Sequence, residues 1–398
     1  MTTRQFAVPT VLRMVPNHLL HEFLTGLGHQ LDPSWQALKE KEIKPILDFL
    51  DELSRPDLDL VESGLRSVSD LATETGLNAI LEAASLMGIG NLGSEIPEEL
   101  CIWGRTMWLW IHHKELFEKA QIIHQIDNLS WWRKRNDLPS TDPDLSAIAL
   151  EQLEERIAVL LREQGRGKDC TVETLKRGDT VYFFAYPDDF VQNVIVHDAD
   201  GHLAPDTFRQ TLQIVFAYDK IDGSLETYAK LAKPFKEKLE SIFADSILHW
   251  EIADYDPEAA YALDHLKDSS FELSTDAQDA LRVRIRKIRL ADKRSGRRIL
   301  LEVDADDPND SIHNAINDCL NLEQTPLSAL HVTLVTFCFE FLPLDSRKPG
   351  RQSFDVGFPR SCSLRNARPE RVELIQKYLK RWKIDLAKST EESAVSVG

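Results

Sequence analysis

The chain has 398 residues, of which 42% are apolar, and it carries a formal net charge of −18. That length and composition allow two or three domains with cores of their own, and they exclude a chain that is disordered throughout. The acidic balance would repel nucleic acid over most of the surface. An anionic partner would therefore have to be met by a local cationic site.

Neither the start of the chain nor its apolar segments indicate secretion or membrane insertion. The first residues lack a basic segment followed by a continuous apolar run and a cleavage site. The longest apolar stretch, Val332 to Leu342, contains Glu340 and is far shorter than the roughly 20 residues of a membrane span. These features predict a soluble cytoplasmic protein that does not associate with a membrane.

The five cysteines are far apart in the sequence, and no two of them form a CxxC pair. This spacing argues against a disulfide framework and against a zinc site built mainly from thiolates. We expect buried or neutral thiols. No GxSxG, P-loop, kinase or Rossmann signature occurs, so the sequence predicts neither a catalytic nucleophile nor a bound cofactor.

Apolar residues recur at three- and four-residue spacing from about residue 16 to residue 164, which predicts an all-helical domain over residues 1–165. Pro45 should kink or split the helix around it, because proline cannot donate a hydrogen bond to the preceding turn. The longest helical stretch extends from Pro97 to Ile126, where Gly104 is a candidate break.

After the glycine-rich segment 164–170 the apolar period changes from 3.6 to 2, which predicts a domain boundary near residue 165. Residues 166–270 are expected to form an antiparallel β-hairpin domain with helices. Its first strand should break at Pro187, and Asp222-Gly223 should form the turn of the second hairpin. Helices are then predicted over residues 233–248 and 257–267.

The last third is expected to be an α+β region over residues 271–384, followed by a disordered tail over residues 385–398. Strands are predicted from residue 281, over 297–304 and over 331–343, and helices over 308–321 and 368–384. The fold class is therefore α+β, with an all-helical N-terminal domain followed by mainly antiparallel sheet with packed helices.

One short stretch of this acidic chain is strongly basic. Between its first and last arginine it holds nine Lys and Arg residues and a single acidic residue, Asp292. Guanidinium and ammonium groups gathered in this way are suited to an anionic partner. The anion-binding candidates are Arg282, Arg284, Arg286, Lys287, Arg289, Lys293, Arg294, Arg297 and Arg298.

The alternation within this stretch predicts a strand. Arg282, Arg284 and Arg286 would then share one face, with aliphatic residues on the other. The alternation reverses at Lys287 and Ile288, which indicates a bulge there. A turn around residues 295–296 should bring the chain back as a second strand and place the remaining basic residues at the tip of a hairpin.

Three interpretations of this basic surface remain open. Its charge can be neutralised by the acidic residues that follow, which are Glu302, Asp304, Asp306, Asp307 and Asp310. It can instead bind an anion, since arginines two apart on a strand stand roughly 7 Å from each other, similar to the phosphate spacing along a nucleic-acid strand. It can also form an interface with the acidic surface of another subunit.

Carboxylates and histidines near the expected turns are weaker candidates for a divalent-metal site. The acidic residues are Asp188, Asp189, Asp198, Asp200, Asp219 and Asp222, with His197 and His202 close by. Asp is also common in tight turns for conformational reasons, and this explanation covers most of these positions. His18 and His21, like His112, His113 and His124, have helical spacing but no HExxH motif. We predict no metal site.

Tryptophans gather in the first third of the chain, and "WWRKRNDLP" joins two of them to three basic residues. Aromatic rings beside Arg and Lys can hold a partner peptide or stack on bases. Tryptophans on one helical face also commonly anchor a helical core. The partner-binding candidates are Trp108, Trp131, Trp132, Arg133, Lys134 and Arg135.

Several longer segments carry a resemblance. The sequences "SWWRKRNDLP", "QGRGKDC", "FFAYPDDF", "LQIVFAYDKIDGSLETYA" and "FPRSCSLRNARPERVELIQKYLKRWKI" resemble those of a family of uncharacterised bacterial proteins of about this length. The resemblance covers most of the chain from Trp103 onward. It implies no assigned activity, but it suggests a gene of the variable part of bacterial genomes, where antiphage functions are common.

Together these features predict a non-enzymatic recognition or regulatory subunit, such as a sensor in antiphage defence. It would bind an anionic partner, either nucleic acid or an acidic protein, through the basic sheet face, and a protein partner through its aromatic surface. One alternative is a metal-dependent nuclease or phosphodiesterase that uses the turn carboxylates, with Asp198 and Asp200 as the residues to test. The other is a structural subunit of a larger complex.

Overall fold

The structure is a computed structural model that describes residues 6–31, 35, 38–197, 201–252, 260–304, 306–307, 310–344, 347–364 and 369–386. Its contacts group the chain into two compact units, the first ending at Leu129 and the second beginning at Ser130. Each unit has its own set of buried apolar side chains. The chain as a whole belongs to the α+β class, with N-terminal helices followed by antiparallel sheets.

Within the described residues of the first unit, every regular element is a helix. Its core includes Phe23, Val68, Met107 and Phe117, all at most 1% exposed. The helices are α1 (Val8–Met14), α2 (Asn17–Gly26), α3 (Lys44–Asp51), α4 (Arg55–Leu71), α5 (Glu74–Leu86), α6 (Leu92–Glu95), α7 (Ile102–His112) and α8 (Lys114–Asn128).

Local sequence explains where several of these helices begin. Ser54 and Thr73 cap α4 and α5, because each side-chain oxygen accepts a hydrogen bond from a backbone N–H of the first turn. Pro45 lies in the first turn of α3, where its missing N–H costs nothing, so the proline starts a helix and does not split one. The long helical stretch is broken at His113, not at Gly104, which is buried inside α7.

The division between the units lies earlier than the predicted boundary near residue 165. Strand β1 (Arg133–Arg135) pairs with a strand of the second unit, and α9 (Ala147–Arg162) packs against the same sheet. The helical period of α9 resembles that of the preceding helices. The sequence alone therefore does not reveal that α9 packs against a sheet and not against other helices of the first unit. The described residues of 166–270 and of 271–384 also belong to one compact unit.

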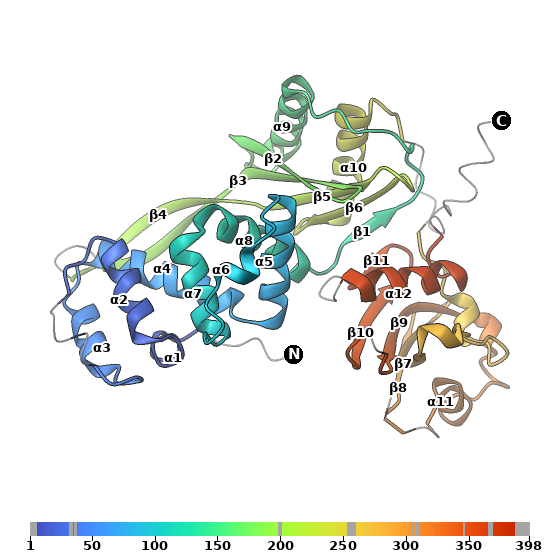
Figure 1. The fold of residues 1–398 in the computed structure, drawn as a ribbon. Helices are drawn as coiled ribbons and strands as arrows, with labels where there is room; N and C mark the ends of the chain where they lie inside the picture. The colour runs from blue at the N-terminus through green and yellow to red at the C-terminus, as the bar shows by residue number, and fades with distance from the viewer. Residues whose placement is uncertain are drawn as a thin grey trace. The chain divides into compact units, whose positions relative to one another are not determined.

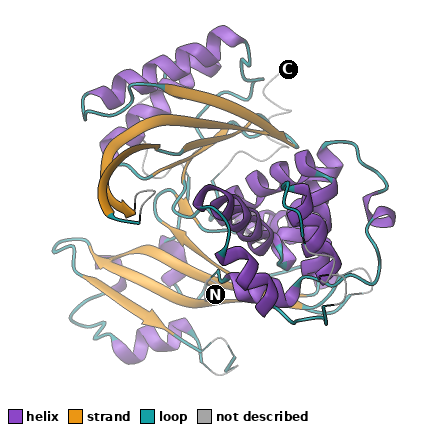
Figure 2. Ribbon diagram, turned by 90° about the vertical axis from the view of Figure 1, so that its left-hand side faces the viewer, coloured by secondary structure: helices purple, strands orange, loops and turns teal. Residues whose placement is uncertain are grey.

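The first sheet of the second unit has the strand order β1-β6-β5-β3-β2, with β4 paired to β3, and all of its pairs are antiparallel. Helices α9 and α10 cover one face (Figures 1 and 2), and Phe183, Phe216 and Phe243 are fully buried between them and the sheet. The bounds are β2 (Cys170–Arg177), β3 (Thr180–His197), β4 (Leu203–Thr211), β5 (Ile214–Asp219), β6 (Ser224–Ala229) and α10 (Lys233–Leu248).

Two turn predictions have different outcomes in this sheet. Strand β3 passes through Pro187 without a break, and the irregularity appears as a register shift between Asp188 and Val191. The predicted turn at Asp222-Gly223 is confirmed. Gly223 has φ +64°, and an added Cβ would collide with the carbonyl oxygen of Leu138, so this position requires glycine.

The second sheet has the order β11-β10-β9-β7-β8 and is also antiparallel. Helix α12 packs on its apolar face, where the Phe339 and Trp382 ring centroids are 5.8 Å apart. The elements are η2 (Asp264–Lys267), η3 (Ala277–Asp279), β7 (Leu281–Asp292), β8 (Arg298–Glu302), α11 (Ile312–Cys319), η4 (Leu327–Ala329), β9 (Leu330–Phe341), β10 (Gly350–Gly357), β11 (Ser361–Cys362) and α12 (Pro369–Arg381).

Two predicted segments of this region differ from the structure. Of the helix predicted over residues 257–267, the described part contains only the 3₁₀ turn η2, preceded by a bridge between Tyr261 and Asp385. Asp385 itself is 5% exposed, so the predicted tail is ordered at its first residue. The tail from residue 387 onward lies outside the described residues.

No helix in the described ranges is both long enough and apolar enough to cross a lipid bilayer.

Candidate functional site: the cationic end of the β7–β8 hairpin

The basic stretch forms the predicted hairpin. Strand β7 pairs antiparallel with β8, from Lys287 opposite Glu302 to Ala291 opposite Arg298. The pairing of β7 with β9 skips Arg286, so the bulge lies next to the predicted position. Because one extra residue restores the alternation, the aliphatic residues before and after the bulge both face the core.

The half of the outer face nearest the start of β7 is neutralised. Glu302 lies 3.3 Å from both Arg286 and Lys287, and Glu340 lies 4.0 Å from Arg282. Arg284 donates a hydrogen bond to the backbone oxygen of Asp307 at 3.0 Å. Carboxylates on the neighbouring strands therefore neutralise much of the charge of the β7 arginines. This agrees with the interpretation in which acidic residues neutralise the basic surface.

Three carboxylates of the acidic segment after β8 have partners outside β7. The carboxylate of Asp304 accepts from the backbone N–H of Asp306, and that of Asp310 accepts from the backbone N–H of Asp304. Asp306 forms an ion pair with Arg351 of β10. Glu302 and Glu340 form ion pairs with arginines of β7, and Glu340 belongs to β9.

The far end of the hairpin is a turn organised by Asp292. Its carboxylate accepts hydrogen bonds from the backbone N–H groups of Arg294 and Ser295, at 2.9 and 2.6 Å. These bonds hold the pKa of Asp292 below its usual value. Gly296 completes the turn with φ +70°. The one acidic residue of the stretch thus serves as an acceptor for backbone groups of the turn.

The remaining basic residues gather around this turn, and we call them the cationic hairpin end. All but Arg289 are exposed, and none of the five forms an ion pair with a carboxylate in the part of the chain that the structure describes. Lys293 donates to the backbone oxygen of Ser328 at 2.9 Å. The members are Arg289, Lys293, Arg294, Arg297 and Arg298.

Arg289 shows that positive charge accumulates here. Partial burial and the neighbouring charge of Arg298 both lower its pKa. Its guanidinium donates to the hydroxyl and backbone oxygens of Thr333, at 2.9 and 3.4 Å. These uncharged acceptors fix its orientation, and the carboxylate of Asp355 partly opposes the lowering of its pKa. An anion near Arg289 and Arg298 would further reduce their mutual repulsion.

Most of the predicted partner-binding segment is buried, although it was expected at the surface. Trp132 is 1% exposed, Lys134 8% and Arg135 3%, which removes these three side chains from any contact surface of the folded chain. Trp131 is 72% exposed. Trp108, in the first unit, is partly buried and lies against the rings of His112 and His113.

The basic residues of this segment are buried because carboxylates distant in sequence surround them. Glu240 of α10 is 1% exposed and lies 3.0 Å from Arg133, 3.4 Å from Arg135 and 3.2 Å from Arg360. Burial and the two neighbouring arginines lower the pKa of Arg360 to about 10, although Glu240 opposes this. On the other face of β1, Lys134 lies 2.8 Å from Asp385.

The turn carboxylates that were considered for a metal site have other partners. Asp188 lies 3.9 Å from Arg209, and Asp189 lies 3.0 Å from Arg166. Asp222 accepts from the backbone N–H of Ser224, as expected of a turn residue, and Asp219 does the same with Ile221. Asp198 and Asp200 lie outside the described residues. Over the described ranges, no group of three or more potential metal ligands comes together.

The cysteines are free thiols. Burial raises the pKa of Cys170 to about 12 and that of Cys362 to about 11, so both are protonated at neutral pH. This agrees with the expectation of neutral thiols for these two positions.

The sequence did not single out a polar groove of about 500 Å³ between α4 and α8 in the first unit. Partial burial raises the pKa of Asp70 and lowers that of His124, which places two perturbed titratable groups in the groove. The polar residues of this groove come from helices that are distant in the sequence and form no sequence motif, so the sequence alone does not predict the groove. The polar lining is Ser69, Asp70, Thr73, Gln121, His124, Gln125 and Asn128.

Comparison with models of protein families gives no match, and comparison with curated proteins gives no significant match.

Proposed function

We propose that this protein is a recognition protein that binds nucleic acid through the cationic hairpin end. The observation that carries the proposal is the concentration of five basic residues around one turn, none of which forms an ion pair among the described residues, on a chain of net charge −18. A local site of this kind is what an acidic protein needs to bind a polyanion.

The geometry of the hairpin favours a phosphate backbone over an isolated anion. Arg289 and Arg298 lie on adjacent strands, while Arg294 and Arg297 lie in the turn, so the charges spread over several residues of extended chain. Cations distributed in this way can contact several phosphates of one nucleic-acid strand. The resemblance to uncharacterised bacterial proteins supports a regulatory or sensor role in antiphage defence as the setting.

The expected size of the effect follows from counterion release. If four of the five cations contact phosphates, the logarithm of the affinity should fall against the logarithm of salt concentration with a slope of roughly −3 to −4. Between 50 and 200 mM salt this corresponds to a loss of affinity of about 100-fold. The test is fluorescence anisotropy of labelled 20-nucleotide single-stranded DNA, single-stranded RNA and duplex DNA across this salt range.

The decisive variant is Arg294→Glu combined with Arg297→Glu, since both side chains are exposed in the turn. We expect the affinity to fall at least 10-fold and the salt slope to become shallower by about 2. Arg162→Glu with Lys168→Glu makes the same change of net charge at exposed positions outside the hairpin and should leave the slope unchanged. Equal losses in both double variants, or no binding by the unaltered protein at 50 mM salt, would refute the proposal.

A further inference from the structure

Strand β8 is an edge strand of the second sheet. It pairs with β7 on one side, and no other strand of the described ranges pairs with its far side, which we call the β8 edge. At the opposite edge of the sheet β11 has only two residues, and the oxygen of Arg360 beside it accepts from the N–H of Lys134 at 2.7 Å. Unpaired strand edges are templates for the addition of another strand.

The register shows which backbone groups the β8 edge presents. The N–H of Asp292 donates to the oxygen of Arg297 at 2.8 Å, and the N–H of Val303 donates to the oxygen of Arg286 at 2.9 Å. In this antiparallel pair, Arg297 and every second residue up to Val303 therefore direct their backbone groups toward β7. The residues between them direct theirs outward, and these are Arg298, Leu300 and Glu302.

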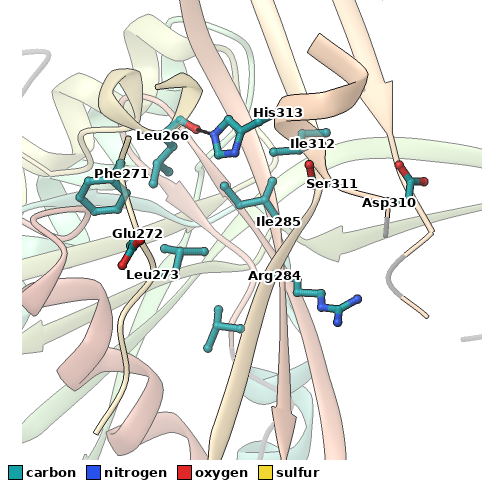
Figure 3. Close-up of a pocket in the computed structure, with 11 residues that line it drawn as sticks. Leu266, Phe271, Glu272, Leu273, Arg284, Ile285, Asp310, Ser311, Ile312 and His313 are labelled. Carbon is teal, nitrogen blue, oxygen red and sulfur yellow. Dashed lines mark hydrogen bonds between the residues drawn. The ribbon is translucent and has the colours of Figure 1, made fainter. Parts of the chain in front are cut away.

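The outward-directed residues are accessible to a further strand. Each offers one N–H and one C=O, and no hydrogen bond within the described ranges occupies these groups. Their side chains lie on the outer face of the sheet, where Leu300 is 56% exposed between two charged residues. Helix α11 begins on the other face, since Figure 3 shows its Ile312 beside Ile285 of the core side.

The sequence of the β8 edge is complementary to itself. It has a cation at its start, an apolar residue at its centre and a carboxylate at its end. If the β8 strand of a second copy runs antiparallel with Leu300 opposite Leu300, then Arg298 lies opposite Glu302 at both ends. Each opposed pair exchanges both N–H···O bonds, because all of these residues direct their backbone groups outward. Apolar pairs and pairs of opposite charge across strands are stabilising.

Other registers match less well. Outward-directed residues can bond only to outward-directed residues, so the register can shift only by two residues at a time. A shift by one such step in either direction places Leu300 opposite a charged residue, either Arg298 or Glu302. The register centred on Leu300 is therefore the one that pairs apolar with apolar and also pairs Arg298 with Glu302.

The charges around the β8 edge favour the same arrangement. Arg298 is exposed and forms no ion pair among the described residues, while the side chain of Glu302 remains 45% exposed beside the cations of β7. The antiparallel arrangement also brings the turn of one copy, with Arg294 and Arg297, to the end of the pair where the exposed Asp304 of the other copy lies. This corresponds to the interpretation in which the basic surface meets an acidic surface of another subunit.

We propose that two copies of this chain associate through their β8 edges, as antiparallel strands centred on Leu300, which joins their second sheets into one continuous sheet. A strand of five residues buries much less surface than the roughly 1,200–2,000 Å² of a stable interface. The association is therefore weak, with a dissociation constant in the micromolar range. It does not depend on nucleic-acid binding, although Arg298 belongs to both surfaces.

Two single charge reversals test the register. Arg298→Glu places two carboxylates opposite each other at both ends of the strand pair, and Glu302→Arg places two guanidinium groups there. Like charges directly opposite each other are destabilising, so each variant should self-associate at least 10-fold more weakly. An equimolar mixture of the two variants restores opposite charges at both ends and should associate about as tightly as the unaltered chain.

Sedimentation velocity over about 1 to 200 μM protein, without nucleic acid, measures the association. Hydrogen exchange of residues 298–302 should slow as the concentration rises, because the outward N–H groups become bonded. An unaltered chain that stays monomeric up to about 200 μM would overturn the proposal. So would a mixture of the two reversal variants that associates no better than either variant alone.

A central substitution with a matched control tests the two-fold axis. Leu300→Asp places two carboxylates opposite each other at the centre of the strand pair and should weaken the association at least 10-fold. Ile148→Asp makes the same type of change at a position 69% exposed on α9 and should have no effect. Equal association of the two variants would contradict the proposed interface. Both positions are exposed, so neither variant should lose its fold.

The association and the proposed function can fail separately. Nucleic-acid anisotropy with nanomolar protein reports on the monomer, because a micromolar dimer is dissociated at that concentration. A chain that binds nucleic acid but stays monomeric in sedimentation would refute the association alone. A chain that dimerises through the β8 edge without binding nucleic acid would refute the proposed function alone.

Discussion

The substitution Glu240→Gln tests how the buried arginines of the second unit are held. The carboxylate is 1% exposed and lies within 3.4 Å of three guanidinium groups, from Arg133, Arg135 and Arg360, which are 14%, 4% and 5% exposed. Glutamine keeps the shape of the side chain but removes its charge. Asp137, bonded to Arg135, would be the main carboxylate left to balance the group.

The expected loss follows from the cost of leaving a buried charge uncompensated. Removing one partner of a buried ion pair typically costs about 3–5 kcal/mol. Because each 1.4 kcal/mol is a factor of ten, amides of β5, β6 and α10 that exchange only when this unit opens should exchange more than about 100-fold faster. Hydrogen exchange with mass spectrometry measures this effect separately from the helical unit.

Glu237→Gln is the matched control on the same helix. Glu237 is 38% exposed and lies 3.6 Å from Arg133 and 3.7 Å from Lys233, so its loss should change the free energy of unfolding by less than about 1 kcal/mol. If the two variants accelerate exchange to the same extent, Glu240 does not compensate the arginines and the reasoning is wrong.

Two further predictions concern a turn and an ion pair. Gly223→Ala should lower the thermal unfolding midpoint far more than Gly296→Ala. Both glycines have positive φ, but of the two only Gly223 has backbone atoms in the space that a Cβ would occupy. Equal shifts of the midpoint in scanning calorimetry would contradict this prediction. Hydrogen bonds from Arg381 and Lys377 lower the pKa of Asp276 from 3.8 to about 2. Ionised Asp276 should therefore stabilise the fold above pH 4, and this stabilisation should be lost as the pH falls through 2. A carboxyl NMR titration of Asp276 with a midpoint near 4 would refute this prediction.

The hairpin illustrates what local pattern can predict. Alternation from Arg282 to Arg286 indicated a strand with its cations on one face, and the reversal at Lys287 indicated the bulge. These features depend on the two-residue period of a strand, which is written in consecutive residues. The neutralising carboxylate of Glu340 was not predicted, because it reaches the hairpin only through the pairing of β7 with β9.

The segment "WWRKRNDLP" illustrates what local pattern cannot predict. Its composition would suit a partner-binding surface or a buried ionic cluster equally well. Burial of Arg133 depends on Glu240, 107 residues further along the chain, and burial of Arg360 depends on the same carboxylate from 120 residues away. Sequence spacing carries no record of such contacts, so Lys134 and Arg135 were expected at the surface.

The sequence by itself determined the α+β class, most of the helices and strands, and the existence of a cationic hairpin, since each of these follows from periodicity and turn chemistry between near neighbours. Tertiary structure decided which cations form ion pairs, where the compact units divide, and how far β8 extends along β7. These properties arise when strands and helices distant in sequence pack together, because burial and charge pairing depend on neighbours in space.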